Sequence, residues 1–556
     1  MTPIDRRRFL QLTLVAAGGM VMLDGCGKGT SATKGPVSTT PLPGEPSGPA
    51  PRPSLRLASP DDGFPSPFAY GPGTYELVLF MYDTLLLADP DGTLQPWLAS
   101  RYEPSPDGLT HRFELRDARW HDGRPVTADD VAFSFSYFKA READLPPTVL
   151  FRPSFVDRAV ATGPRSVEVR LTKPARPFAA EVAGRFPIFP KHVWEGVAEP
   201  LDVIDPKLLV GSGPYKMTSF DPTNSGYEFV ANDDFMLGKP FVKSASYHKV
   251  NDELVALRAN DIDIATTPVG RPTRAALSAF KGGDTYGILA GKPDFFAALS
   301  WNLAKEGPTS DVAFRRACAQ ALDRRLLVER LLGDGEVGNP GVLPPDHPFH
   351  ARVEQYAFDV KAANKTLDDA GYRRKKGDKG LRTTPDGKDL RLKMLTFPEG
   401  AATAEILKQS LAEIGVDLVF QPTDFFTAIT DGQLKNYEMA LLFFGGVRRD
   451  PDSLRTILAS QTEGTGIFHS LGWANTEFDD LAEKQLVNLD DAGRKAQVGR
   501  MQELVAADLP FLILYYSVPY YAFRRQVFDQ WSPEGEAKYS LVTGRAGGGL
   551  QIRPIA

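Results

Sequence analysis

Two histidines in a proline-rich stretch, His347 and His350, have the most obvious metal-binding chemistry in this 556-residue chain. Zinc and nickel sites in proteins are built from three or more converging nitrogen, sulfur or oxygen ligands. No further histidine or cysteine lies near this pair in the sequence. We therefore predict no metal site here, and no other pattern implies a cofactor.

A glycine pattern of the dinucleotide-binding type spans Gly333 to Gly338. It follows a predicted helix and precedes Asn339-Pro340, whereas a dinucleotide fingerprint needs a strand before it and a helix after it. The sequence also contains no Gly-x-Ser-x-Gly elbow, no phosphate-binding P-loop and no His-Glu-x-x-His motif. We therefore predict no catalytic residues and expect that the chain is not an enzyme.

The first 26 residues predict export. Basic residues in Arg6–Leu10 precede an apolar run, Leu12–Leu23, of about twelve residues, whereas a membrane span needs ~20. This order is typical of a signal peptide, and Arg-Arg-x-Phe-Leu resembles a twin-arginine export signal. The string Leu23–Cys26 resembles a lipobox, which implies that Cys26 is lipidated. Asp24 departs from that pattern, because the position is usually small and uncharged.

Residues 27–54 follow as a stretch dominated by Gly, Ser, Thr, Pro and Lys, with almost no large apolar side chains. Such a composition cannot bury enough surface to order itself, so we predict a flexible linker. The chain is expected on the periplasmic or cell-surface side, held to a membrane by its lipid anchor.

Overall composition excludes two classes of protein. A net charge of −6 argues against a nucleic-acid partner, which would require a basic surface. The chain has only two cysteines, Cys26 in the leader and Cys318 in a helical pattern, so a disulfide framework is excluded.

The remaining chain alternates between helical and strand patterns. Residues 110–116 alternate polar and apolar side chains like a half-buried strand, and Thr127–Asp130 forms a capping box that starts a helix. An apolar stripe predicts one helix over 311–332, with Asp311 as its N-cap and Cys318 buried on the stripe. Further helices are predicted at 360–370 and 403–414, and strands at 416–420 and 439–444. Single strands between helices predict α/β lobes with largely parallel sheets.

A series of short blocks occurs in a fixed order along some 450 residues of the chain. The blocks are Leu79–Leu86, Leu94–Ala99, Phe113–Arg116, Trp120–Val131, Gly211–Tyr215, Asn260–Asp263, Phe314–Ala317, Ala321–Arg324, Leu367–Gly371, Asn475–Asp479 and Asp508–Pro510. In this order they resemble the family 5 extracellular solute-binding proteins, the oligopeptide-, dipeptide- and nickel-binding group of ABC importers.

The resemblance implies an α/β fold of the type II periplasmic-binding-protein kind, with two discontinuous lobes around a cleft and an additional domain. It assigns residues 55–87, 206–290 and 511–556 to lobe I, 88–205 to an additional domain packed on lobe I, and 291–510 to lobe II. The chain is expected to re-enter or cross between lobes at Gly211–Tyr215 and Ala298–Asn302.

The implied function is that of a substrate-binding lipoprotein of an ABC importer, which captures a peptide or other small organic solute by lobe closure. The alternative is a ligand-sensing module that reports to a membrane receptor without transport. The implied partners are the ligand, the ABC permease and the membrane that holds the anchor, and we expect a monomer.

Ligand contacts are expected from aromatic side chains and exposed backbone near the crossings, because binding sites are mostly apolar with a few placed polar groups. The candidates are Tyr70, Trp301, Asn302, Phe443, Phe444, Gly445, Arg448 and Trp473.

One departure from the family bears on the ligand. Peptide-binding relatives carry an acidic residue shortly before a proline in this region, where it pairs with the free amino terminus of the peptide. Counting back from Pro451 reaches Gly446 or Val447 instead. Arg448 points to an anionic group on the ligand, although Asp450 or Asp452 could replace the missing carboxylate if the loop shifts.

Overall fold

The computed structural model describes most of the chain beyond the linker. The described residues are 54–525, 528–529 and 553–554, apart from 60–62, 69–71, 89–93, 143–152, 241, 266–275, 282–283, 291–294, 333–334, 376–379, 425–426, 429–436, 446, 448–449, 461–471 and 518–519.

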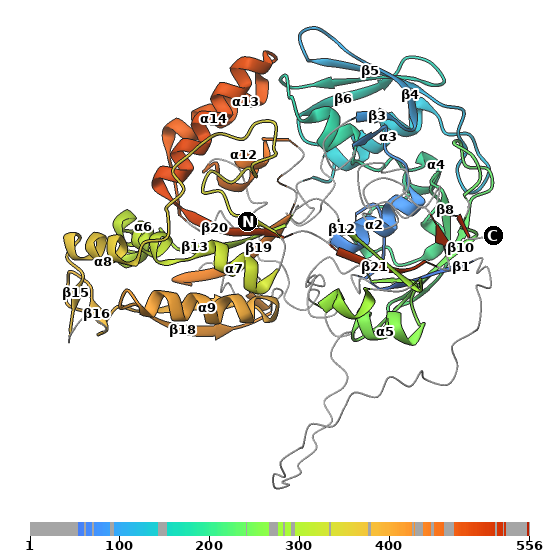
Figure 1. The fold of residues 1–556 in the computed structure, drawn as a ribbon. Coiled ribbons are helices and arrows are strands. Elements are labelled where there is room, and N and C mark those ends of the chain that lie inside the picture. The colour runs from blue at the N-terminus through green and yellow to red at the C-terminus, as the bar shows by residue number, and fades with distance from the viewer. Residues whose placement is uncertain are drawn as a thin grey trace.

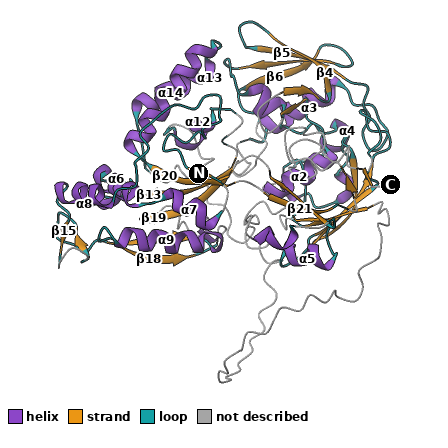
Figure 2. Ribbon diagram, viewed as in Figure 1, coloured by secondary structure: helices purple, strands orange, loops and turns teal. Residues whose placement is uncertain are grey.

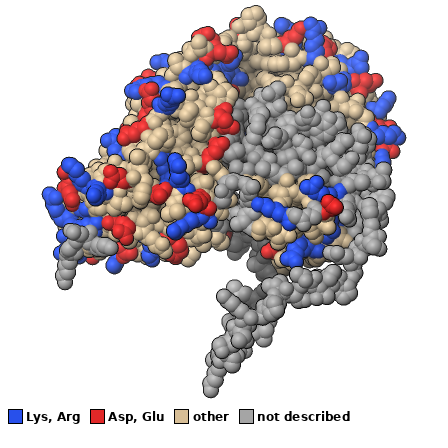
Figure 3. Space-filling model, in the orientation of Figure 1, with Lys and Arg blue, Asp and Glu red and all other residues tan. Residues whose placement is uncertain are grey.

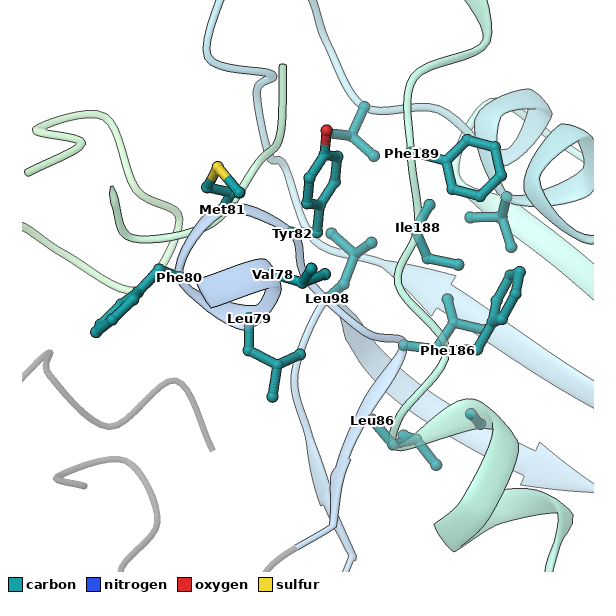
Figure 4. Packing of buried hydrophobic residues seen from close by; sticks show 14 of the residues in the cluster. Val78, Leu79, Phe80, Met81, Tyr82, Leu86, Leu98, Phe186, Ile188 and Phe189 are labelled. Atoms are coloured by element: carbon teal, nitrogen blue, oxygen red, sulfur yellow. The ribbon is translucent and has the colours of Figure 1, made fainter. Parts of the chain in front are cut away.

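One part of the molecule is built on a seven-stranded sheet in the order β12-β21-β11-β1-β10-β9-β8. Its strands are β1 (Ser54–Ala58), β8 (Tyr215–Asp221), β9 (Gly226–Ala231), β10 (Ser244–His248), β11 (Ile264–Ala265), β12 (Tyr286–Ala290) and β21 (Tyr520–Arg524). The helices α2 (Pro72–Met81) and α5 (Glu253–Ala259) and the 3-10 turn η4 (Ala276–Phe280) belong to the same part. Side chains of α2 lie in a core with Phe186, Ile188 and Phe189, which come from a distant part of the sequence (Figure 4).

A four-stranded antiparallel sheet in the order β4-β5-β7-β6 shares that core. Its strands are β4 (Ala99–Pro104), β5 (Thr110–Leu115), β6 (Val156–Ala161) and β7 (Ser166–Leu171). The same stretch of chain also contains α3 (Ala128–Lys139), the π-helix η1 (Phe178–Ala183), α4 (Lys191–Trp194), η2 (Pro200–Asp202), η3 (Pro206–Leu208) and the hairpin β2 (Leu86–Ala88) with β3 (Leu94–Pro96). The predicted capping box begins α3, because Thr127 accepts from the Asp130 N–H and Asp130 accepts from the Thr127 N–H.

The other part is built on a six-stranded sheet in the order β14-β20-β13-β19-β17-β18. Its strands are β13 (Phe295–Trp301), β14 (Glu336–Val337), β17 (Arg391–Thr396), β18 (Asp417–Pro422), β19 (Met439–Gly445) and β20 (Phe511–Ser517). The accompanying elements are η5 (Pro308–Ser310), α6 (Val312–Ala321), α7 (Arg324–Leu331), α8 (Val360–Asp369), the hairpin β15 (Arg373–Arg374) with β16 (Arg382–Thr383), η6 (Pro398–Gly400), α9 (Ala401–Ala412), α12 (Ser453–Leu458), α13 (Thr476–Val487) and α14 (Asp491–Asp508). A short pair, β22 (Phe528–Asp529) with β23 (Arg553–Pro554), lies near the carboxyl terminus.

Both faces of the six-stranded sheet are buried. Alternate residues of β13 enter different cores: Ala297 and Leu299 join side chains of α6 to α9, whereas Phe296 and Ala298 join those of α12 to α14. The ribbon shows these two helical layers on either side of the sheet (Figures 1 and 2). A ligand therefore has access to this sheet at the ends of its strands and not on its faces.

Several sequence predictions are confirmed with small shifts at the ends. Strand 110–116 is β5, helices 360–370 and 403–414 are α8 and α9, and strands 416–420 and 439–444 are β18 and β19. Cys318 is fully buried, and the Asp311 side chain caps α6 by accepting from the Ala313 N–H.

The single helix predicted over 311–332 is wrong. The chain leaves the helical conformation at Leu322, and the Asp323 side chain accepts from the Leu326 N–H to start α7. An aspartate competes for backbone hydrogen bonds in a helix interior and favours a cap, which explains the break.

The expectation of largely parallel sheets is also wrong. Among the strands that the structure describes, parallel pairing is confined to β1 with β10 and β11, and to β17 with β18 and β19. The strands that enter or leave each sheet at a crossing, β12, β13, β20 and β21, all pair antiparallel to their neighbours. Parallel neighbours are usually joined by a helical crossover connection. The crossing strands have no such connection, so nothing requires them to run parallel to their neighbours.

His121 fixes the turn through which the chain enters β8. Its Nδ1 accepts from the Gly211 N–H at 3.2 Å, so the ring N–H is on Nε2, which donates to the Gly213 carbonyl at 3.0 Å. A Cβ at Gly211 would lie 1.7 Å from the Met81 carbonyl oxygen, so only glycine allows this approach. Burial lowers the pKa of His121 to about 4.

We expect the His121 interaction to make folding stability depend on pH. The folded-state pKa of about 4 lies below the unfolded value near 6.5, so the stability it provides is complete above pH ~6.5 and is lost as pH falls toward 4. The difference in unfolding free energy between pH 7 and pH 4 should shrink by about 3 kcal/mol in His121→Gln, which offers an acceptor and a donor without titrating. Urea denaturation at a series of pH values measures this. An unchanged pH profile in the variant would contradict the assignment.

Candidate ligand-binding site

The chain passes between the two large sheets twice, and both passages lie where the same strand ends of the two sheets face each other. We call these strand ends the crossing edge. In the six-stranded sheet, Phe295 at the start of β13 is paired with Gly445 at the end of β19 and with Ser517 at the end of β20. In the seven-stranded sheet, Ala290 at the end of β12 is paired with Tyr520 at the start of β21. Both connections, 290–295 and 517–520, therefore run between the same two edges, as the hinge segments of a two-lobed protein do.

Strand ends also gather at this edge. The parallel strands β17 and β19 run toward it, and in the seven-stranded sheet β1, β10, β11 and β12 share the direction that ends at Ala290. In open α/β sheets, ligands bind outside the carboxyl ends of the strands. The region between the two sheets at this edge is therefore the candidate ligand-binding site.

Phe443, close to the end of β19, lies on the face of the sheet that α9 covers. It pairs with Ala297, which pairs in turn with Tyr515, so the three residues form one row across the sheet. The Tyr515 hydroxyl lies 3.0 Å from the Thr403 hydroxyl in α9, and burial raises the pKa of Tyr515. On the same face, a Cβ at Gly400 would lie 3.0 Å from the Phe443 ring, so this glycine allows the backbone before α9 to approach the ring. Phe443 remains only partly buried.

Two buried ion pairs hold the segment that follows β19. The Asp450 carboxylate accepts from Arg494 in α14 at 2.6 and 3.1 Å. The Asp452 carboxylate accepts two bonds of 2.7 Å from Arg455 in α12. Gln485 in α13 joins the two pairs, because it donates to Asp452 at 2.7 Å and accepts from Arg494 at 3.1 Å. Desolvation raises the pKa of Asp450 in spite of the neighbouring guanidinium.

These contacts overturn one expectation about the ligand. Asp450 and Asp452 were the candidates to replace the carboxylate that pairs with a peptide amino terminus. Both carboxylates instead face inward to Arg494 and Arg455, and a buried carboxylate that lost its arginine would remain uncompensated.

Trp301 and Asn302 lie at the opposite end of β13, because Trp301 pairs with Met439 at the start of β19. Six residue steps separate this end from Phe295, roughly 20 Å along a strand. The crossing predicted at Ala298–Asn302 is therefore wrong, because the chain already enters this sheet at Phe295. Trp301 is fully buried, and Asn302 donates to the Tyr437 carbonyl and accepts from the Ala304 N–H, so both have structural contacts.

Trp473 also lies away from the crossing edge. Its indole N–H donates to Asp508 at 3.1 Å, and its ring packs edge-on against Phe478. Asp508 comes shortly before β20 begins, so Trp473 belongs to the end of the sheet that holds Trp301.

Of the other predicted contacts, Phe444 and Gly445 lie in β19 beside Phe295 at the crossing edge. Tyr70 and Arg448 lie outside the described residues, as does Cys26. The structure therefore divides the predicted site: Phe443, Phe444 and Gly445 are at the crossing edge, whereas Trp301, Asn302 and Trp473 are not.

No sequence pattern pointed to Arg494 and Gln485 near the candidate site. They lie in α14 and α13, about 40 residues beyond Asp450, and each looks like an ordinary polar residue of an amphipathic helix. Their burial depends on how two distant helices pack, which no spacing rule expresses.

The described surface carries no concentrated charge of one sign in the visible view, since Lys and Arg alternate with Asp and Glu (Figure 3). Among the described residues, no group of three or more His, Cys, Asp or Glu converges to hold a metal ion. No helix within the described ranges has the length and apolar character needed to cross a membrane.

Comparisons with known proteins agree with one another. Residues 93–466 match the family model described as bacterial extracellular solute-binding proteins, family 5. Protein XP55 of Streptomyces lividans is 30% identical over 446 residues, which cover 78% of each chain. A Brucella ovis protein that carries the name ABC transporter peptide-binding protein is 24% identical over 70% of this chain and 72% of its own. The solved structure of NikA from Brucella suis in complex with Fe(III)-EDTA has a TM-score of 0.78 at 20% identity, covering 91% of this chain and all of that one.

We expect the Asp450–Arg494 pair to be essential for stability beneath the site. Replacing Arg494 with Met leaves the buried Asp450 carboxylate without its cation, which should reduce the free energy of unfolding by about 3–5 kcal/mol. The double variant Asp450→Asn with Arg494→Met removes both charges and should recover at least half of that loss. Guanidinium denaturation of the three proteins checks this. A double variant as unstable as Arg494→Met would contradict the buried-charge explanation.

Proposed function

Because this chain belongs to the family 5 bacterial extracellular solute-binding proteins, we propose that it captures a small organic solute outside the cytoplasmic membrane and delivers it to an ABC importer. The observation that carries the proposal is the pair of short connections, 290–295 and 517–520, at the edge where strand ends of both sheets meet. Two sheets joined in this way can close on a ligand by small backbone changes in the connections.

The proposed lobes follow the sheets. Lobe I contains the seven-stranded sheet, and the additional domain, 88–205, contains the four-stranded sheet that shares its core. Lobe II contains the six-stranded sheet and extends to Ser517, beyond the boundary at residue 510 predicted from the sequence, because β20 pairs with β13. The permease would recognise the closed form, which the ligand populates through its higher affinity for it.

The proposed binding surface lies at the end of β19 and includes Phe443, Phe444 and Gly445, with Arg448 and Tyr70 as further contacts. The inward-facing carboxylates of Asp450 and Asp452 support a ligand that does not require a carboxylate partner at this position. Arg448 would pair with an anionic group such as a carboxylate. We therefore propose an acidic or amino-blocked compound and not a free dipeptide, and we propose that it leaves the protein unchanged.

Thermal unfolding of the purified mature protein should identify the ligand class. A compound that binds only the folded state at 100 times its dissociation constant stabilises by about 2.7 kcal/mol, a shift of several degrees. We expect such shifts from acidic or N-acetylated compounds within a panel of peptides, sugars, opines and metal chelates. Strong shifts from free dipeptides together with none from acidic or blocked compounds would contradict the proposed role of Arg448. Mass spectrometry of the recovered compound should show it unmodified.

We also propose that the twin-arginine-like signal exports the chain and that Cys26 anchors it through lipid. Cys26→Ser should move the protein from the membrane fraction to the soluble fraction, since stable anchoring depends on the acyl chains. Immunoblotting of fractionated cells measures this, with Cys318→Ser as the matched control because that thiol is buried in the folded chain. If Cys26→Ser remained in the membrane fraction, Cys26 would not be the anchor. The departure of Asp24 from the lipobox pattern would then explain why the motif is not processed.

A further inference from the structure

The additional domain also touches lobe II. The residues that make this contact are separated in the sequence from both connections, 290–295 and 517–520. Lys173 Nζ lies 2.5 Å from the Glu483 carboxylate, and Arg176 pairs with Asp491. The Arg176 N–H donates to the Leu486 carbonyl at 2.9 Å. These residues connect the end of β7 to the turn between α13 and α14, which approaches the four-stranded sheet at the top of Figure 1.

Apolar side chains support the same contact. Leu486, the penultimate residue of α13, is fully buried in the core shared by the seven- and four-stranded sheets, although its helix belongs to the other part of the molecule. Leu489 and Pro174 both lie beside Gly108, since a Cβ there would be 3.2 Å from the Leu489 side chain and 3.4 Å from that of Pro174. Burying a leucine from one part in the core of another stabilises the arrangement in which they touch.

Phe155 extends this contact to the buried ion pairs. It precedes β6 with a φ of 71°, a left-handed conformation that is unusual for a bulky residue. Its ring is approached by Arg455, whose guanidinium carbon lies 5.7 Å from the ring centre, and by Lys173 at 6.0 Å. Backbone strain of this kind persists where surrounding contacts over-determine it and often occurs in switching segments.

A continuous series of contacts therefore joins the domain contact to the proposed binding surface. Leu486 is bonded to Arg176 across the boundary, and its neighbour Gln485 donates to Asp452. Asp452 holds Arg455, which faces Phe155 of the additional domain. The same network holds Asp450, which follows β19.

We propose that Lys173, Arg176, Glu483, Leu486 and Asp491 form a latch that holds the additional domain against lobe II and biases the chain toward the closed arrangement before any ligand is bound. The contacts are features of the structure itself, and only the distinction between an open and a closed form rests on the proposed function. Opening the lobes would separate these residues and expose Leu486, while the two connections at the crossing edge bend.

Charge reversal on one side of the latch provides the test. Glu483 and Asp491 are 55% and 80% exposed, so Glu483→Lys with Asp491→Lys should fold normally but place like charges beside Lys173 and Arg176. The matched control is Glu477→Lys with Glu503→Lys, which reverses two carboxylates of similar exposure that pair with Arg500 inside the same helical pair. The rescue variant adds Lys173→Glu and Arg176→Glu.

Spin labels at Val160→Cys in β6 and Lys495→Cys in α14 report the separation by pulsed electron paramagnetic resonance. Both positions are exposed, Cys318 is buried, and Cys26→Ser removes the remaining thiol. Without added solute, the parent chain should show a population at the label separation of this structure, in which the latch contacts are made. The latch reversal should reduce the ratio of closed to open chains about tenfold, because two pairs change from attraction to repulsion. The control should leave the ratio within twofold, and the rescue should restore it.

A parent chain with no closed population, or a reversal that matches the control, would overturn the latch. Either result would leave solute capture untouched, because the thermal-shift panel tests binding separately. Conversely, a failed panel together with a rescued distance distribution would retain the latch and refute the proposed function.

Discussion

Two ion pairs buried under the end of β19 fix the geometry on which the candidate site depends. Removing two carboxylates and two guanidinium groups from water carries a penalty of several kcal/mol per ion, and close pairing only offsets it. Apolar residues of similar volume would fill the space at least as stably. The ion pairs are better explained as positioning contacts. Together with Gln485, they attach Asp450 and Asp452 to three different helices and so fix where these two residues lie after the strand.

The same constraint reaches two neighbouring features. Toward the sheet, it holds Asp450, which follows shortly after Gly445 at the end of β19. Toward the additional domain, it places Arg455 against Phe155 and positions the end of α13 so that Leu486 enters the other core. The ion pairs beneath β19 are in this way linked to the contact between the additional domain and lobe II. We expect a change in the ion pairs to alter that contact, and a change in the contact to alter the ion pairs.

Sequence reasoning succeeded where a short pattern has one physical reading. The capping box at Thr127, the Asp311 cap and the apolar stripe that buries Cys318 all depend on residues within one or two turns of helix, and the ordered blocks identified the family. It failed where the outcome depends on long-range pairing. The break at Leu322–Asp323 requires weighing a cap against a continuing stripe, and the antiparallel crossing strands depend on which sheet each strand joins. The predicted contacts were divided for the same reason: Phe443 lies near the crossing edge, whereas Trp301 was assigned to a crossing that lies at the other end of its strand.

Solute capture requires that the folded chain holds a small solute and releases it unchanged, and equilibrium dialysis tests this directly. Purified protein would be dialysed against a mixture of small acidic, amino-blocked and free peptides, opines and chelates, and the retained compounds would be identified by mass spectrometry. We expect one class of compound to be retained at one molecule per chain, acidic or blocked at its amino end, and to be recovered intact. Retention of nothing, or recovery of a chemically altered product, would contradict solute capture.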